Sequence, residues 1–514
     1  MSFIVEPERR LPVVYDVDVA VVGGGTAGVV AAIAAARTGA RTVLIERFGS
    51  LGGCPTVGRM ASMANRFLDA YLRKTIAGIP LEIMDRLVKT RGVPYSTLEE
   101  ALRGKIGVPY TIPFDPETLA YVLIQMVEET GVDLMLHTFF SEAIMEGDKV
   151  CGVIVQNKSG RQAVKAKVVV DASGEADVAA SAGAPYISSP KTTWGLLMRI
   201  GNVDIEKIVK YFLSIEAGKP QPEYTEWLAK YLGLSVEEVK KDRYWNHLLD
   251  PQPYGHVPST HPGARFFTPE TQKWFKDRWE ADGFFYNFEM PVFRDLLKKA
   301  VEDGYLELRR KIDNIGEIRF NWDGFAGGAW GKGVVLVNAI MPAEGFDGTN
   351  AEHITKAEVA ARKRAFELAT FFKKYMPGFE NSYVIDTGVQ TMPRHARMIE
   401  GEYTLTWEDA HGIGKRFDDA VYLFPGGGIP GFPHQVPYRI MLPKKVENLL
   451  VAGKCASGAT YVRSILSCMA MGQAAGTAAA LAAKKGVAPR QLDVKDLQET
   501  LKEQDVILDV RDMR

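Results

Sequence analysis

Residues 16–46 read DVDVAVVGGGTAGVVAAIAAARTGARTVLIE, and this stretch decides the fold. The valine run at its start and the RTVLIE at its end each predict a short buried strand. Between them, the alanine-rich residues from about Ala27 to Thr38 predict a helix, and Gly39 stands where a C-terminal cap belongs. A strand, a glycine-rich turn, a helix and a second strand in this order form a β-α-β unit.

The turn before this helix is GGGTAG at 23–28, which fits the pattern G-x-G-x-x-G. Gly23 permits a tight turn, Gly25 lets the backbone approach a pyrophosphate, and Gly28 lets the helix lie close to the strand. The helix N-terminus then offers N–H groups and a partial positive charge to the phosphates. Glu46 ends the second strand, where a carboxylate accepts hydrogen bonds from an adenosine ribose. The unit therefore predicts a bound dinucleotide.

The segment after Glu46 distinguishes between dinucleotide cofactors. It reads RFGSLGGC at 47–54, and its glycine pair follows the strand closely enough for the chain to turn back along the cofactor. Such a return brings the backbone toward a flavin ring, so the segment favours FAD over NAD. The predicted cofactor-binding residues of these two turns are Gly23, Gly25, Thr26, Ala27, Gly28, Glu46, Arg47, Gly52, Gly53 and Cys54.

Length and charge set broad limits on the protein. The chain has 514 residues, which predicts two or more domains. Lysine plus arginine number 62 and aspartate plus glutamate number 63, so the formal net charge is −1. This balance gives no electrostatic reason to expect nucleic acid or an anionic membrane as a partner.

Cysteine usage and apolar stretches bear on the compartment. The four cysteines fit neither a zinc motif nor a disulfide framework, and the first residues lack the apolar core of a signal peptide. We therefore expect a cytoplasmic protein with no metal site. Residues 19–36 and 464–483 carry no charge and reach the length of a membrane span, but they are rich in glycine and alanine. We expect them to be buried elements packed against a cofactor.

Residues typical of helix starts and of turns predict further secondary-structure elements. Asp115-Pro116 predicts the start of a helix, and Glu146-Gly147-Asp148 predicts a hairpin turn between two strands. Ser235 with Glu238, and Thr355 with Glu358, have the spacing of helix capping boxes. Aromatic residues are concentrated between 241 and 300, which suits a lid or a substrate-covering region.

The two glycine turns resemble those of the FAD-dependent oxidoreductase family that groups with the glutathione-reductase-like flavoproteins. Three further blocks are similar to that family: VVVDASGEADVAASAGAP at 168–185, LTWEDA at 405–410, and LLVAGKCASGATYVRSILSCMAMGQAAGTAAALA at 449–482. The resemblance implies an α/β fold with a Rossmann-type FAD-binding domain built from residues 1–190 and 440–514. Residues 191–439 would form an inserted α+β substrate-binding or cap domain.

The later blocks add cofactor-binding residues. The resemblance places Ala172, Ser173, Gly174 and Asp177 near the nucleotide. Gly453 ends a predicted strand where a small residue lets the ribityl chain pass. We expect Gly472, Gln473, Ala474 and Ala475 to open or interrupt a helix whose N–H groups point at the N1/O2 edge of the flavin, which gains negative charge on reduction.

The sequence lacks the residues that several kinds of redox chemistry require. A disulfide reductase of this superfamily carries a second cysteine five residues after the first, but Arg59 stands there after Cys54. No second G-x-G-x-x-G unit for a nicotinamide cofactor and no iron–sulfur cysteine cluster is apparent. Electrons are therefore expected to pass between noncovalently bound FAD and a small substrate, oxygen or an external carrier.

Six residues are candidates for the chemistry itself. A hydride transfer to flavin needs a base for the accompanying proton, or a cation for an anionic group. His434, in a Gly/Pro-rich loop, and His395 are candidate bases; in the resembling family an acid usually stands at the position of His395. Arg59, Arg394 and Arg463 are candidate anion holders, and Tyr461 precedes the flavin helix.

Three functions remain open from the sequence. The first is a dehydrogenase or oxidase that transfers a hydride from a small polar metabolite to flavin N5. The second is a carrier-fed flavin reductase of an activated C=C bond, with an arginine as proton donor. The third is a non-catalytic electron-transfer flavoprotein subunit. For each, a homo-oligomer is expected from the resemblance.

Overall fold

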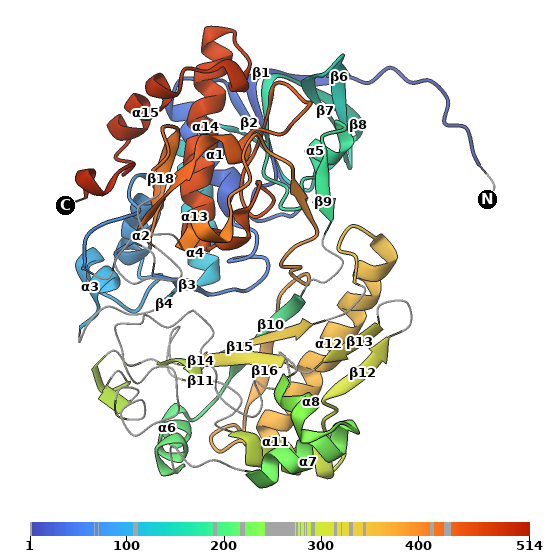
Figure 1. Cartoon of the computed structure of the whole chain (residues 1–514), viewed down its shortest axis with the longest axis vertical. Coiled ribbons are helices and arrows are strands. Elements are labelled where there is room, and N and C mark those ends of the chain that lie inside the picture. The colour runs from blue at the N-terminus through green and yellow to red at the C-terminus, as the bar shows by residue number, and fades with distance from the viewer. Residues whose placement is uncertain are drawn as a thin grey trace.

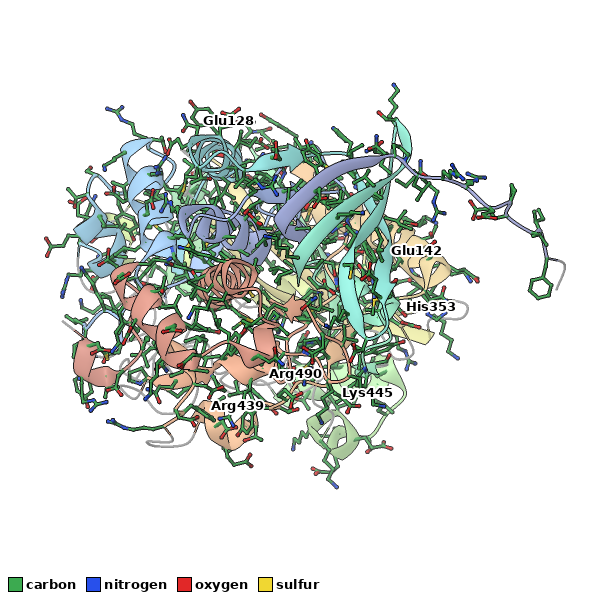
Figure 2. The ribbon with its side chains drawn as sticks, turned by 90° about the horizontal axis from the view of Figure 1, so that it is seen from above. Glu128, Glu142, His353, Arg439, Lys445 and Arg490 are labelled. Carbon is green, nitrogen blue, oxygen red and sulfur yellow. The ribbon has the colours of Figure 1, made fainter. Side chains whose placement is uncertain are left out.

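The computed structural model describes most of the chain. The described residues are 3–513 without 66, 70, 106–110, 189–192, 216–221, 242–272, 274–275, 278, 282, 284, 289–292, 313–315, 320, 328–332, 343–345, 412–415 and 426–432. Most of the aromatic-rich stretch at 241–300 therefore lies outside the described residues. The residues before the first strand extend away from the body of the molecule (Figures 1 and 2), and Phe3, Ile4 and Val5 are exposed.

The first sheet contains the predicted β-α-β unit (Figure 1). Its strands, in spatial order, are β5 (Asp133–Met135), β2 (Thr42–Ile45), β1 (Val13–Val22), β8 (Gly160–Asp171), β7 (Lys149–Asn157) and β6 (Phe139–Glu146), and β20 (Leu449–Val451) pairs with β8. The pairs among β5, β2, β1, β8 and β20 are parallel, whereas β6, β7 and β8 pair antiparallel. The first part of β8 thus pairs with β7, while its last residues lie between β1 and β20.

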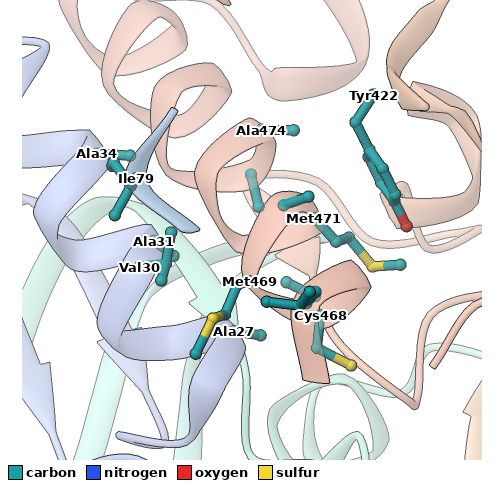
Figure 3. Close-up of a cluster of buried hydrophobic side chains, with 14 of the residues drawn as sticks. Ala27, Val30, Ala31, Ala34, Ile79, Tyr422, Cys468, Met469, Met471 and Ala474 are labelled. Carbon is teal, nitrogen blue, oxygen red and sulfur yellow. The ribbon is translucent and has the colours of Figure 1, made fainter. Parts of the chain in front are cut away.

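Two helices rich in small residues lie together beside this sheet (Figure 3). They are α1 (Thr26–Arg37) and α14 (Ile465–Lys485). A Cβ atom added at Gly472 would lie 2.1 Å from the carbonyl oxygen of Ala27, and one at Gly476 would lie 2.0 Å from that of Ala31. The helices therefore touch backbone to backbone, which explains why the helix sequences hold so much glycine and alanine.

Shorter elements complete this body of the protein. They are β3 (Ser62–Ala64), α2 (Ile79–Lys89), α3 (Leu98–Arg103), β4 (Thr111–Pro113), α4 (Pro116–Glu129), α5 (Asp177–Ser181), β9 (Tyr186–Ser188), β17 (Arg397–Ile399), α13 (Trp407–His411), β18 (Ala420–Phe424), β19 (His434–Pro437), the 3-10 helix η3 (Ala459–Tyr461) and α15 (Val494–Glu503). Asp115 caps α4 as predicted, since its carboxylate accepts hydrogen bonds from the N–H groups of Glu117 and Thr118.

The second sheet is antiparallel and lies below the first body in Figure 1. Its strands, in spatial order, are β11 (Phe285–Phe288), β14 (Asn321–Gly327), β15 (Val335–Pro342), β10 (Thr193–Gly201) and β16 (Tyr383–Thr387). The remaining elements here are α6 (Ile205–Ser214), α7 (Pro222–Leu232), α8 (Val236–Lys241), α11 (Arg294–Glu302), β12 (Arg309–Ile312), β13 (Gly316–Arg319) and α12 (Ala351–Tyr375). We call this part of the molecule the cap.

The two largest of the four hydrophobic clusters among the described residues do not divide at residue 439. The core of the cap contains described residues from Trp194 to Phe379. Leu405, Val421 and Tyr438 instead belong to the core that includes α1 and α14. The chain therefore returns to the first body well before residue 440, because the β18–β19 ribbon packs against α14 rather than against the cap.

One of the two predicted capping boxes is confirmed. Ser235 and Glu238 exchange hydrogen bonds in both directions at the start of α8. The box at Thr355 and Glu358 is wrong, because Thr355 lies inside α12 and its hydroxyl donates to the carbonyl of Ala351. Asn350 caps this helix instead. A polar residue inside a helix can satisfy the same spacing as a cap.

The apolar stretches at 19–36 and 464–483 form part of the core. Among the described helices, α14 is long and apolar enough to cross a membrane by length and composition, but 89% of its most apolar window is buried in the protein. Much of its apolar surface packs against α1 and the β18–β19 ribbon. The interpretation as a buried helix therefore accounts for its composition.

Replacing Gly476 by valine tests the backbone contact between the two helices. The added Cβ would collide with the carbonyl of Ala31, so we expect a loss of about 3 kcal/mol or more in the free energy of unfolding. Lys484→Val, at the exposed end of the same helix, is the control for helix propensity. Equal denaturation midpoints for the two variants would contradict the close packing.

Candidate functional site

Backbone contacts explain the glycines at 23–28. Gly23 has φ +101°, and a Cβ there would lie 2.4 Å from the carbonyl oxygen of Ala172. A Cβ at Gly28 would lie 1.7 Å from the carbonyl oxygen of Gly23, so the helix cannot follow the strand this closely with any other residue. Gly23 and Gly28 are therefore required by the fold itself.

Gly25 differs from its neighbours. A Cβ added there would meet no atom within 4 Å. Gly25 is the N-cap of α1, no side chain caps the helix, and its first turn holds no acidic residue. The N–H groups of Thr26 and Ala27 lie in this first turn. A bare, uncapped helix N-terminus that faces open space has the shape and polarity that a phosphate needs.

Glu46 lies beside the same turn. One carboxylate oxygen accepts a hydrogen bond from the N–H of Gly24 at 2.6 Å, and the other accepts one from the N–H of Phe48 at 2.8 Å. The side chain is buried, and this desolvation raises the pKa of the carboxyl group. Glu46 is thus fixed at the end of β2, where we predict that it binds the ribose.

The second glycine turn lies directly against the first. The N–H of Gly52 donates to the carbonyl of Gly24 at 2.8 Å, and a Cβ at Gly53 would lie 2.9 Å from the Cα of Gly25. Both Gly52 and Gly53 have positive φ. The chain therefore turns back across the N-terminus of α1 as predicted, and Cys54 follows at the end of this turn.

The turn after β8 forms a third side of the site. The N–H of Ala172 donates to the carbonyl of Val22, and Gly174 has φ +88°. Asp171 ties the turn to α5, since its carboxylate accepts hydrogen bonds from both the N–H and the hydroxyl of Ser173 and from the N–H of Ala179. Complete burial raises the pKa of Asp171 to about 6. We did not predict this residue, although it stands at the end of a buried strand.

Asp177 is engaged by the protein. Its carboxylate accepts a hydrogen bond from the Arg397 guanidinium at 2.9 Å, and that arginine lies over the ring of Tyr186. The predicted contact of Asp177 with the nucleotide stays a prediction, while its observed contact joins α5 to β17.

The expectation that residues 472–475 open or interrupt a helix is wrong. α14 begins at Ile465, after the N-cap Ser464, so Gly472, Gln473, Ala474 and Ala475 lie inside the helix. Gly472 faces Ala27, and the side-chain oxygen of Gln473 accepts a hydrogen bond from the N–H of Ile79. The N–H groups that α14 can offer to a ligand are those of its first turn, directly after Arg463.

Gly453 lies where these elements meet. It has φ +97°, its N–H donates to the sulfur of Met471 at 3.2 Å, and a Cβ there would lie 3.3 Å from the Cβ of Ala27. The end of β20, the start of α1 and the middle of α14 therefore converge, as predicted from the positions of their glycines.

Basic side chains gather around Cys54 and His395. The pKa of His395 falls from the ordinary 6.5 to about 3, first because the ring is desolvated and then because Arg463, Lys454 and Arg394 lie near it. Burial raises the pKa of the Cys54 thiol, and the same three cations oppose that rise. His395 is thus a neutral imidazole at neutral pH, among positive charges.

Lys454 is a site residue that the sequence analysis missed. Its ammonium group forms an ion pair with Glu175 and donates to the carbonyl of Pro393 at 2.8 Å. It therefore joins the turn after β8 to the residues directly before Arg394 and His395. Its place directly after Gly453 was the available indication.

The structure shows the following surroundings for the other three candidates. His434 is buried on β19, with its ring centroid 5.2 Å from that of Phe424. Tyr461 is partly exposed at the end of η3. Arg59 binds protein carboxylates, since it contacts Glu117 at 2.5 Å and Asp386 at 3.2 Å. We therefore reassign Arg59 from substrate binding to an interaction between the two parts of the molecule.

A family model described as FAD dependent oxidoreductase matches residues 18–501. The chain belongs to this family. It is an FAD-dependent enzyme, and the uncapped α1 N-terminus, the second glycine turn and Glu46 fit that cofactor. When bound, FAD supplies a two-electron acceptor or donor.

Relatives of this enzyme cover parts of it. Digeranylgeranylglycerophospholipid reductase 1 of Methanococcoides burtonii is 27% identical over 38% of this chain and 47% of its own length. Thiamine thiazole synthase of Methanococcus vannielii is 25% identical over 31% of this chain and 56% of its own. The chain thus spans about half the length of these curated relatives. A geranylgeranyl bacteriochlorophyll reductase-like structure from Thermoplasma acidophilum is 14% identical with a TM-score of 0.42, covering 95% of this chain and 84% of that one.

Gly25→Leu separates folding from cofactor binding. Because a Cβ at this position meets no protein atom, we expect the variant to fold like the unaltered enzyme but to lose FAD by about a hundredfold or more in affinity. The measurement is the flavin content after purification and reconstitution, alongside thermal unfolding of the apoprotein. Ser159→Leu, on the exposed turn after β7, is the control. Full flavin content in Gly25→Leu would show that the phosphates lie elsewhere.

The neutral state of His395 predicts a dependence of stability on pH. Between pH 6.5 and about 3 the unfolded chain binds a proton at this residue that the folded enzyme does not bind. Acid therefore favours the unfolded state, and His395→Asn should lose less stability on acidification. Thermal unfolding from about pH 7 to pH 4 measures this, with His353→Asn as the control. Parallel curves for His395→Asn and the unaltered enzyme would refute the assignment.

Proposed function

We propose that this enzyme oxidises a small polar metabolite that carries an anionic group, acting as a dehydrogenase or an oxidase. The observation that supports this proposal most is the group formed by His395 and its basic neighbours. A neutral imidazole can accept a proton, and Arg394 and Arg463 near it can hold a carboxylate or a similar anion.

The proposed reaction balances without another titratable group. FAD, when bound, would accept the hydride that leaves the substrate carbon with two electrons. His395 takes the proton from the hydroxyl or amine on that carbon, so that a C=O or C=N bond forms. The protonated imidazole then releases its proton to solvent, and oxygen or an external acceptor would return the cofactor to its oxidised state.

The positive surroundings of His395 serve this direction of reaction. Desolvation and, after it, these charges hold the imidazole unprotonated before the substrate arrives, and an anionic substrate offsets the charges when it binds. Binding of the substrate would therefore raise the proton affinity of His395 at the moment when the base is needed. These charges are only partly exposed, so salt screens them less than it screens charges on the open surface.

A carrier-fed reductase of a C=C bond is the second candidate. The names of the relatives favour it, since four of the matched proteins are called digeranylgeranylglycerophospholipid reductases. In that direction a proton must be given to the substrate, which a neutral His395 cannot do. An arginine would then be the donor, as the sequence analysis considered.

The proposal extends to the compartment and the oligomeric state of the enzyme. The four cysteines are free, which is compatible with a reducing cytoplasm. We propose a cytoplasmic homo-oligomer, and the size of the purified particle in solution measures the second part of this statement.

Anaerobic stopped-flow measurements test the direction and the roles of these residues. A small hydroxy or amino acid of the right structure should bleach the oxidised flavin. His395→Gln should slow this step about a hundredfold, while Arg394→Gln should mainly raise KM for the anionic substrate and leave KM for its neutral amide unchanged. Reoxidation of the reduced flavin by an activated alkene, with no bleaching by any acid, would favour the reductase instead.

A further inference from the structure

One segment connects the cap to the loop that carries the second glycine turn, and it leads directly to Arg394. This connecting segment is residues 386–393, which begins at the end of β16. The N–H of Val389 donates to the carbonyl of Val57 at 2.9 Å, and the side chain of Gln390 accepts from Arg47 at 2.7 Å. Both partners follow the FAD-binding strand β2, so the segment lies along the loop that we predict to contact the flavin.

The same segment is bound equally firmly to the cap. The N–H of Met392 donates to the carbonyl of Gly195 on β10. Glu358 of α12 accepts hydrogen bonds from both the N–H and the hydroxyl of Thr391. At its far end the carbonyl of Pro393 accepts from Lys454. Contacts alternate between the two parts of the molecule along its whole length.

Asp386 begins this segment and is shared by two arginines from different parts of the molecule. Arg199, on β10 of the cap, donates to both carboxylate oxygens, at 2.9 Å and 2.5 Å. Arg59, from the loop after the second glycine turn, lies 3.2 Å from one of the same oxygens. The side chains of Arg199, Arg59 and Asp386 are 14%, 18% and 24% exposed, so water screens these charges only partly.

Arg59 also contacts residues of the first body. Its guanidinium contacts Glu117 at the start of α4 and donates to the carbonyl of Thr56. Its backbone has φ +61°, a conformation that costs a non-glycine residue on the order of 1 kcal/mol and persists only where the surroundings impose it. The pKa of Arg199 is raised first by Asp386 and also by Asp115 and Glu117, so the acids of the first body act on the cap.

We propose that Asp386 is a positioning residue for the site: through Arg59 and Arg199 it fixes the connecting segment between the cap and the flavin loop, and so sets where Arg394 and His395 lie. This inference rests on the proposed function of those two residues. Neither Asp386 nor Arg59 needs to touch substrate or cofactor for this role. Without the carboxylate, Arg199 would lose both hydrogen bonds to Asp386, and Arg59 would keep its ion pair with Glu117 but not the one with Asp386.

The test uses the FAD-loaded enzyme with Asp386→Asn. We expect hydrogen exchange of the backbone amides at 387–393 to rise about tenfold or more, and the visible circular dichroism of the flavin to change, both without substrate. With substrate, we expect kcat to fall about tenfold or more while KM for the neutral amide changes little. Glu380→Gln, which removes an exposed ion pair with Lys207 in the same cap, is the matched control.

A second pair of variants decides the matter if Asp386→Asn does not fold. Arg59→Met removes the guanidinium, whereas Arg59→Lys keeps the charge and one of the contacts and should restore part of the protection from exchange. Unchanged exchange at 387–393 in Asp386→Asn, or equal behaviour of Arg59→Met and the unaltered enzyme, would overturn the proposal. Because exchange and dichroism need no substrate, an incorrect substrate class would leave these two results standing.

Discussion

Three backbone segments contact the glycine turn and the first turn of α1 directly. The turn after β8 touches Gly23, the second glycine turn bonds to Gly24, and α14 touches the carbonyl of Ala27. A Cβ atom at Gly23 or Gly472 would collide with the facing backbone, and one at Gly53 would lie 2.9 Å from the Cα of Gly25. The fourth side, at Gly25, is open. A helix N-terminus enclosed in this way has one direction in which it can bind a ligand, and the position of the cofactor follows from that.

An ion pair positions the end of the site that contains Arg394 and His395. Lys454 is neutralised by Glu175, and together they hold the turn after β8 against the residues before Arg394. Desolvating an ammonium group is costly unless a carboxylate compensates it, so this pair is retained for its geometry as much as for stability. Its charge reaches His395 and Cys54, which links the phosphate end of the fold to the place where chemistry is proposed.

Local patterns predicted much of this arrangement. The β-α-β unit, the return at Gly52 and the cap of α4 depend on residues near one another in sequence, and their spacing revealed them. Lys454 and Asp386 could not be found in the same way, because their partners lie far away in the chain. Asp171 was missed although its partners Ser173 and Ala179 lie near it in the sequence. The expectation that residues 472–475 open or interrupt a helix was wrong for a different reason. Glycine pairs in helices indicate close packing as readily as a ligand, and only the presence of Ala27 and Ala31 opposite distinguishes the two.

The position of β20 has a consequence for how the protein is made. This strand, from near the C-terminus, pairs with the last residues of β8, whose other edge is already taken by β1. While the ribosome is still synthesising the cap, that edge of β8 and the face of α1 that later meets α14 have no partner from their own chain. These surfaces can thus be covered only after β20 and α14 have emerged, that is, after the whole cap has been synthesised.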